Sequence, residues 1–149
     1  MRMSWNDWAK SGWLRPHKTS KEEIISLLEI VTRDLKDAET KGLSEDWKFG
    51  IAYNAALKLC TIALHSSGFR PEKNLAHYRT LHSLPLTLGD RYKPEANYLD
   101  LCRKKRNETE YNFAGNISKD EALELIEFCK ELKTTVIAWL NKYHKNLVS

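Results

Sequence analysis

Residues 44–68 read SEDWKFGIAYNAALKLCTIALHSSG, and this stretch is the strongest indication of a helical fold class. Ser44 is a preferred N-cap residue, and the two acidic residues after it suit the positive end of a helix dipole. Apolar residues then recur at helical spacing as far as Gly68, where glycine can take the left-handed conformation that ends a helix. Many of them are alanines, whose small side chains allow a neighbouring helix to approach closely. The stretch therefore predicts a long, closely packed helix.

The sequence on both sides predicts further helices. Regions 20–42 and 118–143 each begin with a Ser-x-x-Glu capping box and continue as an apolar stripe of helical period. Region 94–111 begins with a proline, which suits the first turn of a helix. Region 73–83 is less regular, and Pro85 breaks it before a short restart that Ser83 would cap. A loop is expected at 112–117.

These patterns predict an all-α protein. No segment alternates with period two, so we expect no strands. Short connections favour antiparallel neighbours, which gives an antiparallel four- to five-helix bundle over 19–149, preceded by a short Trp-rich N-terminal arm over 1–18. Within this arm Ser4 would cap a short helix that carries Trp5 and Trp8, is extended by Trp13 and Leu14, and ends at Pro16. We expect the arm to fold back over the bundle, and the alternative is an anchor for a partner or a second protomer.

Composition excludes several classes of protein. The chain has 149 residues and a formal net charge of +4, which fits one domain without a strongly basic surface. It has no apolar run near 18 residues and no secretory leader pattern, so we expect a cytoplasmic protein with no membrane contact. Its three cysteines are widely spaced, which favours core positions. Glycine patterns for phosphate or dinucleotide binding are missing, and no histidine pair has convincing metal-ligand spacing, so we expect no cofactor and no metal.

The sharpest charge cluster is Arg103-Lys104-Lys105-Arg106. On a helix Arg103, Asn107 and Tyr111 follow one another at intervals of four residues and share a face. Arginine binds phosphate through two donors, and tyrosine can stack on a base, so this face is a candidate phosphate or nucleic-acid site. The alternative is a solvated helix face in which Arg106 pairs with a nearby glutamate and Tyr111 anchors the helix end in the core.

Four features together resemble the HEPN superfamily of small prokaryotic helical domains. They are the run Tyr53-Asn54-Ala55-Ala56, the turn Gly68-Phe69-Arg70, His77, and the Arg106-Asn107 pair before Tyr111. The resemblance implies a four- or five-helix bundle that forms a homodimer. It also implies a minimal nucleotidyltransferase as a partner protein, RNA or a nucleotide as ligand, and activity as a ribonuclease toxin. By resemblance the catalytic positions are Arg106, Asn107 and Tyr111, and phosphate is bound by the basic residues Arg103, Lys104, Lys105 and Arg106.

One position departs from the family pattern. Active members have an arginine, four to six residues and then a histidine, whereas here Tyr111 stands in the histidine position. A neutral histidine can transfer protons near pH 7, but an ordinary tyrosine has a pKa near 10. For His77 we expect a structural role, bonded to backbone. The sequence therefore leaves three alternatives: a metal-independent ribonuclease of a toxin–antitoxin pair, an inactive HEPN module that binds nucleotide or protein, and a plain dimeric scaffold.

Overall fold

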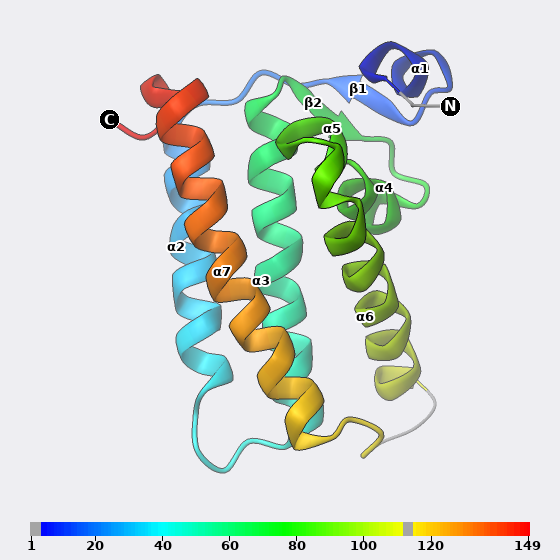
Figure 1. Ribbon diagram of the computed structural model, residues 1–149, viewed down its shortest axis with the longest axis vertical. Coiled ribbons are helices and arrows are strands. Elements are labelled where there is room, and N and C mark those ends of the chain that lie inside the picture. The colour runs from blue at the N-terminus through cyan, green and yellow to red at the C-terminus, as the bar shows by residue number, and fades with distance from the viewer. Residues whose placement is uncertain (1–3, 112–114) are drawn as a thin grey trace.

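The computed structural model describes the backbone of residues 4–111 and 115–149, and the side chains of these residues except 109–111 (Figure 1). Its helices are α1 (Trp5–Lys10), α2 (Lys21–Ala38), α3 (Glu45–Ser66), α4 (Ala76–His82), α5 (Leu84–Leu88), α6 (Lys93–Tyr111) and α7 (Lys119–Tyr143), with 3-10 turns η1 (Asp90–Tyr92) and η2 (Lys145–Leu147). The strands are β1 (Leu14–Pro16) and β2 (Phe69–Pro71). The all-α helical bundle is confirmed.

Helix α3 is the central element of the bundle, and it packs against α2, α7, α6 and α4. Its alanines explain this, because Ala52, Ala55, Ala56 and Ala63 are all fully buried and let neighbouring helices come close on several sides. The helix begins where the sequence predicts, since the Ser44 hydroxyl accepts a hydrogen bond from the Trp47 N–H at 3.2 Å. It ends at Ser66, before Gly68 with its positive φ of 95°.

The two predicted capping boxes differ in outcome. At Ser118 the box is complete, because the serine caps the Glu121 N–H and the Glu121 carboxylate accepts from the Ser118 N–H at 3.0 Å. At Ser20 only the serine half forms, with the Glu23 N–H donating to its hydroxyl at 3.1 Å. The Glu23 carboxylate is instead hydrogen-bonded to the imidazoles of His17 and His65.

The prediction of no strands is wrong. Strand β1 pairs antiparallel with β2, and Arg15 lies opposite Arg70 at the centre of the register. Each strand has three residues and contains a proline, so neither carries an alternating pattern that sequence reasoning can detect. The pairing joins the arm to the segment that leaves α3.

The arm folds back on the bundle, as we expected. Trp8 and Leu14 are buried with Leu64 of α3 in a second, smaller core. Trp5 stacks on Phe69, with ring centroids 4.8 Å apart. Helix α1 begins at the predicted Ser4 cap, and the Ser4 and Asp7 side chains complete a capping box. The expected extension through Trp13 and Leu14 to Pro16 is wrong, because α1 ends at Lys10 and Leu14–Pro16 forms strand β1. Residues 1–3 of the arm lie outside the described residues.

The region around α6 accounts for the remaining fold predictions. Helix α6 spans the predicted range, and the stretch after α3 forms the short helices α4 and α5, which meet at Ser83. Ser83 caps neither of them, because its hydroxyl donates to the Thr80 carbonyl at 2.7 Å.

The three cysteines are buried and unpaired, as predicted. Residues 112–114 of the expected loop lie outside the described residues. No helix in the described part of the chain is long and apolar enough to cross a membrane.

Candidate nucleic-acid interface

The basic run on α6 does not form one continuous surface. The Arg103 Nε donates to the Asp100 carboxylate at 2.8 Å, one turn earlier on the same helix. Lys104 is mostly exposed, and its Nζ lies 3.7 Å from the other oxygen of Asp100. Lys105 points toward α7 and forms an ion pair with Glu121. The run therefore separates, with Lys105 directed toward a different helix from the two arginines.

Arg103 and Arg106 both face tyrosines of neighbouring helices. The Arg106 guanidinium carbon lies 5.4 Å from the ring centroid of Tyr53 on α3, and that of Arg103 lies 5.6 Å from the ring of Tyr78 on α4. Arginines placed over aromatic faces in this way are attracted by the ring quadrupole and are held in place. Tyr53 is buried, and burial raises the pKa of its hydroxyl well above the ordinary value. The Tyr53 ring is thus a neutral platform beneath Arg106.

His77 stands beside the same arginines. It is exposed in the first turn of α4, and its ring centroid lies 6.4 Å from that of Tyr53. Partial desolvation of the ring lowers the pKa of His77, and the positive charges of Arg106, Lys58 and Arg103 lower it further. The imidazole is therefore neutral at neutral pH. We call the surface formed by Lys58, His77, Tyr78, Arg103 and Arg106 the α4–α6 site.

Asp100 is a buried carboxylate that contacts Arg103 of this site and His82. It is buried beneath α4, and besides Arg103 it faces His82, whose Nε2 lies 3.5 Å from its second carboxylate oxygen. Burial acts to raise the pKa of Asp100, but the hydrogen bond and charge of Arg103, followed by those of His82, outweigh this and hold the pKa below its ordinary value. The carboxylate is charged at neutral pH and fixes the Arg103 side chain through Nε. An arginine has four further N–H donors besides Nε.

A pocket of about 370 Å³ opens on the other side of Arg106, toward α2 and the start of α3. Its lining includes Trp47, which is 68% exposed, and Asn54. The Asn54 amide donates to Asp34 at 2.7 Å, and Arg33 donates to the other carboxylate oxygen of Asp34 at 3.0 Å. Arg106 consequently lies at the junction between this pocket and the α4–α6 site.

The predicted site residues differ in outcome. Arg103 and Arg106 come together over α3 and α4, whereas Lys105 is engaged by α7. Asn107 is half-buried. The side chain of Tyr111 lies outside the described residues, so its catalytic assignment stays a prediction.

Sequence reasoning missed two members of the site. In the described part of the chain the His77 ring makes no hydrogen bond to the backbone, contrary to our expectation, and it lies exposed beside the arginines. The signal for it was its presence in the HEPN-like pattern together with Arg106. Lys58 had no signal, because it is an isolated lysine in the middle of α3 and belongs to no basic run.

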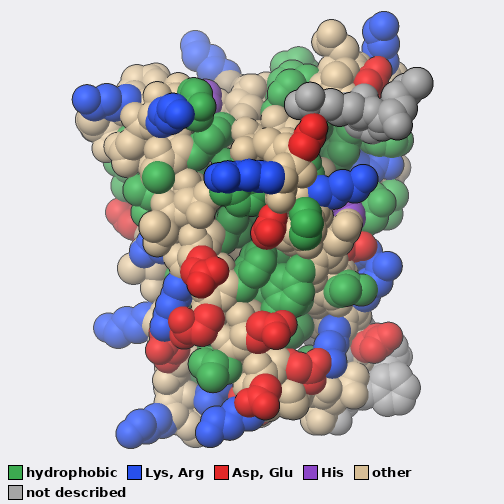
Figure 2. Space-filling model, in the orientation of Figure 1, with side chains coloured by type: hydrophobic (Ala, Val, Ile, Leu, Met, Phe, Trp, Pro, Cys, Tyr) green, Lys and Arg blue, Asp and Glu red, His purple; other side chains and the backbone are tan. Residues whose placement is uncertain are grey.

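One face of the molecule is mixed in charge. On the face seen in Figure 2, Lys and Arg side chains are interspersed with Asp and Glu, and no uniform basic layer covers the described residues there. On this face, therefore, positive charge does not form a continuous layer. Comparison of the chain with protein-family models, with curated proteins and with solved structures found no match.

Proposed function

We propose that this chain is a HEPN-like helical-bundle protein that binds RNA through the α4–α6 site and the adjoining pocket. The observation that carries the proposal is the position of Arg106. Arg106 belongs to the α4–α6 site, where its guanidinium lies over the Tyr53 ring, and it also lines a pocket with an exposed tryptophan. A nucleotide has the matching parts, since its phosphate is an anion and its base is a flat ring.

The chemistry of the two regions fits single-stranded RNA. Lys58, Arg103 and Arg106 supply positive charge for successive phosphates, and arginine donors match phosphate oxygens two at a time. Tyr78 is 37% exposed and Trp47 is 68% exposed, so both rings can stack on unpaired bases. In single strands the bases are accessible in this way, whereas in duplex RNA they are stacked inside the helix.

Cleavage of the bound RNA is a second function, favoured by His77. Metal-independent cleavage requires a base for the 2′-hydroxyl, an acid for the leaving 5′-oxygen and a cation beside the phosphorane. His77 is a neutral imidazole that shares Tyr53 as a neighbour with Arg106, so it can accept the 2′-hydroxyl proton as the 2′-oxygen attacks phosphorus. The bond from phosphorus to the 5′-oxygen then breaks and leaves a 2′,3′-cyclic phosphate. The leaving oxygen takes a proton from solvent water, and His77 returns its proton to solvent. His77 would thus serve as the base in place of the HEPN histidine, whose position in this sequence is occupied by Tyr111.

The oligomeric state, partner and cellular role are proposed from the HEPN resemblance alone. By that resemblance the protein is a cytoplasmic homodimer that pairs with a minimal nucleotidyltransferase and acts as the toxin-like component of the pair. The alternative is a catalytically inactive HEPN dimer module that binds nucleotide or protein.

Binding is tested with a fluorescently labelled single-stranded RNA, followed by anisotropy over a series of salt concentrations. Arg106→Ala and Arg103→Ala should each weaken binding and reduce the dependence of log K on log salt by about 0.7 for each phosphate that the variant no longer neutralises. Lys142→Ala on α7 is the matched control, because it removes one positive charge from a different surface and should leave affinity unchanged. Equal effects of all three variants, or no RNA binding by the wild type, would contradict the proposal.

Cleavage is tested separately by incubating unlabelled RNA with the protein in EDTA and analysing the products on a gel. His77→Asn should abolish cleavage and leave the anisotropy titration nearly unchanged. If the wild type binds RNA without cutting it, the inactive module is supported and the role of His77 as a base is wrong.

A further inference from the structure

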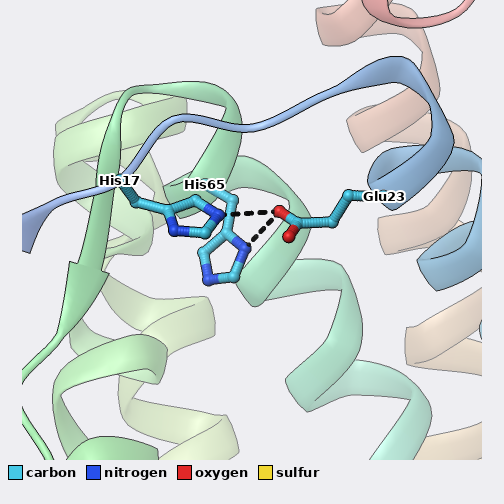
Figure 3. Close-up of side chains that lie close together, drawn as sticks. All are labelled: His17, Glu23 and His65. Carbon is cyan, nitrogen blue, oxygen red and sulfur yellow. Dashed lines mark hydrogen bonds and ion pairs between the residues drawn. The ribbon is translucent and has the colours of Figure 1, made fainter.

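A second cluster of chemically active side chains lies at the other end of α3, where α3 ends and α2 begins. His17 follows β1, Glu23 is in the first turn of α2, and His65 is in the last turn of α3 (Figure 3). One carboxylate oxygen of Glu23 lies 2.9 Å from the His17 Nε2 and 2.8 Å from the His65 Nδ1. The three ligand atoms all lie within 4.8 Å of one another. They converge on one point although they come from three separate segments.

The residue types and their spacing suit a first-row metal ion. Two imidazole nitrogens and one carboxylate oxygen form a common donor set for zinc, with a fourth position for water. At zinc–ligand distances near 2.0–2.1 Å, two ligand atoms of a tetrahedron are about 3.3 Å apart. The two measured separations are therefore about 0.5 Å too short, and small rotations of the side chains would open them.

The local environment supports the same interpretation. The side chains of His17 and His65 are 20% and 16% exposed, so the cluster is largely enclosed and still open to solvent. Burial acts to raise the pKa of Glu23, but hydrogen bonds from His17, His65 and Thr19 lower it to about 2, so the carboxylate is charged. Desolvation lowers the pKa of His65, which favours the neutral imidazole. Arg70 opposes a cation here, since its positive charge also acts on His65.

The Glu23 carboxylate does not accept the capping-box hydrogen bond from the Ser20 N–H. Its position in the sequence suits a capping box with Ser20, and the equivalent glutamate of α7 makes that bond. At α2 the carboxylate faces the histidines instead. The same oxygen also accepts a hydrogen bond from the Thr19 hydroxyl at 2.8 Å, which holds the carboxylate in its orientation toward the two imidazoles.

We propose that His17, Glu23 and His65 bind a Zn²⁺ ion, which joins the N-terminal arm to α2 and α3. A bond to His17 would fix the segment between β1 and α2, while the other two ligands belong to the bundle. The site shares no residue with the α4–α6 site. Because an ion that binds only the folded state stabilises it by mass action, zinc should raise the melting temperature.

The proposal is tested on the full chain after treatment with EDTA and removal of the chelator. Zn²⁺ is titrated in competition with a chromophoric chelator, and Co²⁺ is added in a parallel sample to record the visible bands of a four-coordinate site. We expect one ion per chain. His65→Gln and Glu23→Gln should each weaken zinc binding by at least about 10-fold, the lower end of the effect seen for groups that only support a ligand.

His144→Gln is the matched control, because it removes a histidine that is not part of the cluster. Circular dichroism establishes that each variant is folded, and the rise in melting temperature with Zn²⁺ gives a second measurement that should disappear in the ligand variants. No zinc binding by the wild type would overturn the proposal. Equal affinities for His65→Gln and His144→Gln would also overturn it, because the ion would then be held elsewhere.

Discussion

The N-terminal arm should contribute to the stability of the whole protein, and Trp8 measures that contribution. Trp8 is 6% exposed and packs with Leu14 and Leu64. Burying a tryptophan removes about 150–250 Å² from water. At about 25 cal/mol per Å² this corresponds to about 4–6 kcal/mol, an upper limit because the unfolded chain is itself partly compact.

Two features of the structure reduce this upper limit. The Trp8 Nε1–H is buried without a hydrogen-bond partner among the described residues, and an unsatisfied donor costs about 1–3 kcal/mol. The arm can also detach as a unit, so the effect cannot exceed the free energy with which the arm docks. We therefore expect Trp8→Ala to lower the free energy of unfolding by about 3 kcal/mol. Trp8→Phe keeps an aromatic ring and removes the unsatisfied donor, so it should cost less than about 1.5 kcal/mol.

The assay is urea denaturation followed by circular dichroism in the far ultraviolet. Trp47→Ala is the control, because that side chain is 68% exposed and should change stability by less than about 0.5 kcal/mol. Equal urea midpoints for Trp8→Ala and Trp47→Ala would contradict this expectation, because packing of the arm would then contribute nothing to the free energy of unfolding.

Three further predictions concern the core, the α4–α6 site and a helix cap. Burial raises the pKa of Cys60 to about 12 and of Cys102 to about 11, and also raises that of Cys129, so a colorimetric thiol reagent at mildly alkaline pH should react slowly with the native protein and quickly in denaturant. Rapid reaction of the native protein would contradict their burial. The folded-state pKa of Asp100 is depressed, so its stabilising contribution is present above the unfolded value of 3.8 and is lost as pH falls through the folded pKa. Acid titration should therefore destabilise the wild type more steeply than Asp100→Asn, and parallel curves would refute this. Ser118→Ala removes the cap of α7 and should lower the free energy of unfolding by about 1 kcal/mol, as measured by the urea midpoint; an unchanged midpoint would mean that the cap is dispensable.

The helices were predictable because their signals are local. Ser44 and Gly68 mark the two ends of α3, and the alanines between them indicate close packing, so the central element follows from the single stretch 44–68. Helices α2 and α7 follow from their caps in the same way. The short pair of strands was not predictable, because its stability depends on contacts between residues 14–16 and 69–71 that no local pattern records.

The two candidate sites differ in how close their residues lie in the sequence. The arginines of α6 were found because they belong to one continuous basic run in the chain. His77 was assigned a structural role, since only the packing of α4 against α6 brings it beside Arg106. The cluster of His17, Glu23 and His65 was missed because its members are far apart in sequence. An antiparallel arrangement of α2 and α3 does place the first turn of one beside the last turn of the other, and that was the available signal.

The central claim is that Arg106 contacts RNA phosphate at the junction of the α4–α6 site and the pocket. The most direct measurement is the salt dependence of single-stranded RNA binding by the wild type, Arg106→Ala and Lys142→Ala. We expect that, of these two variants, only Arg106→Ala weakens binding and reduces the slope, by about 0.7 if Arg106 neutralises one phosphate. An unchanged affinity and slope for Arg106→Ala would contradict it.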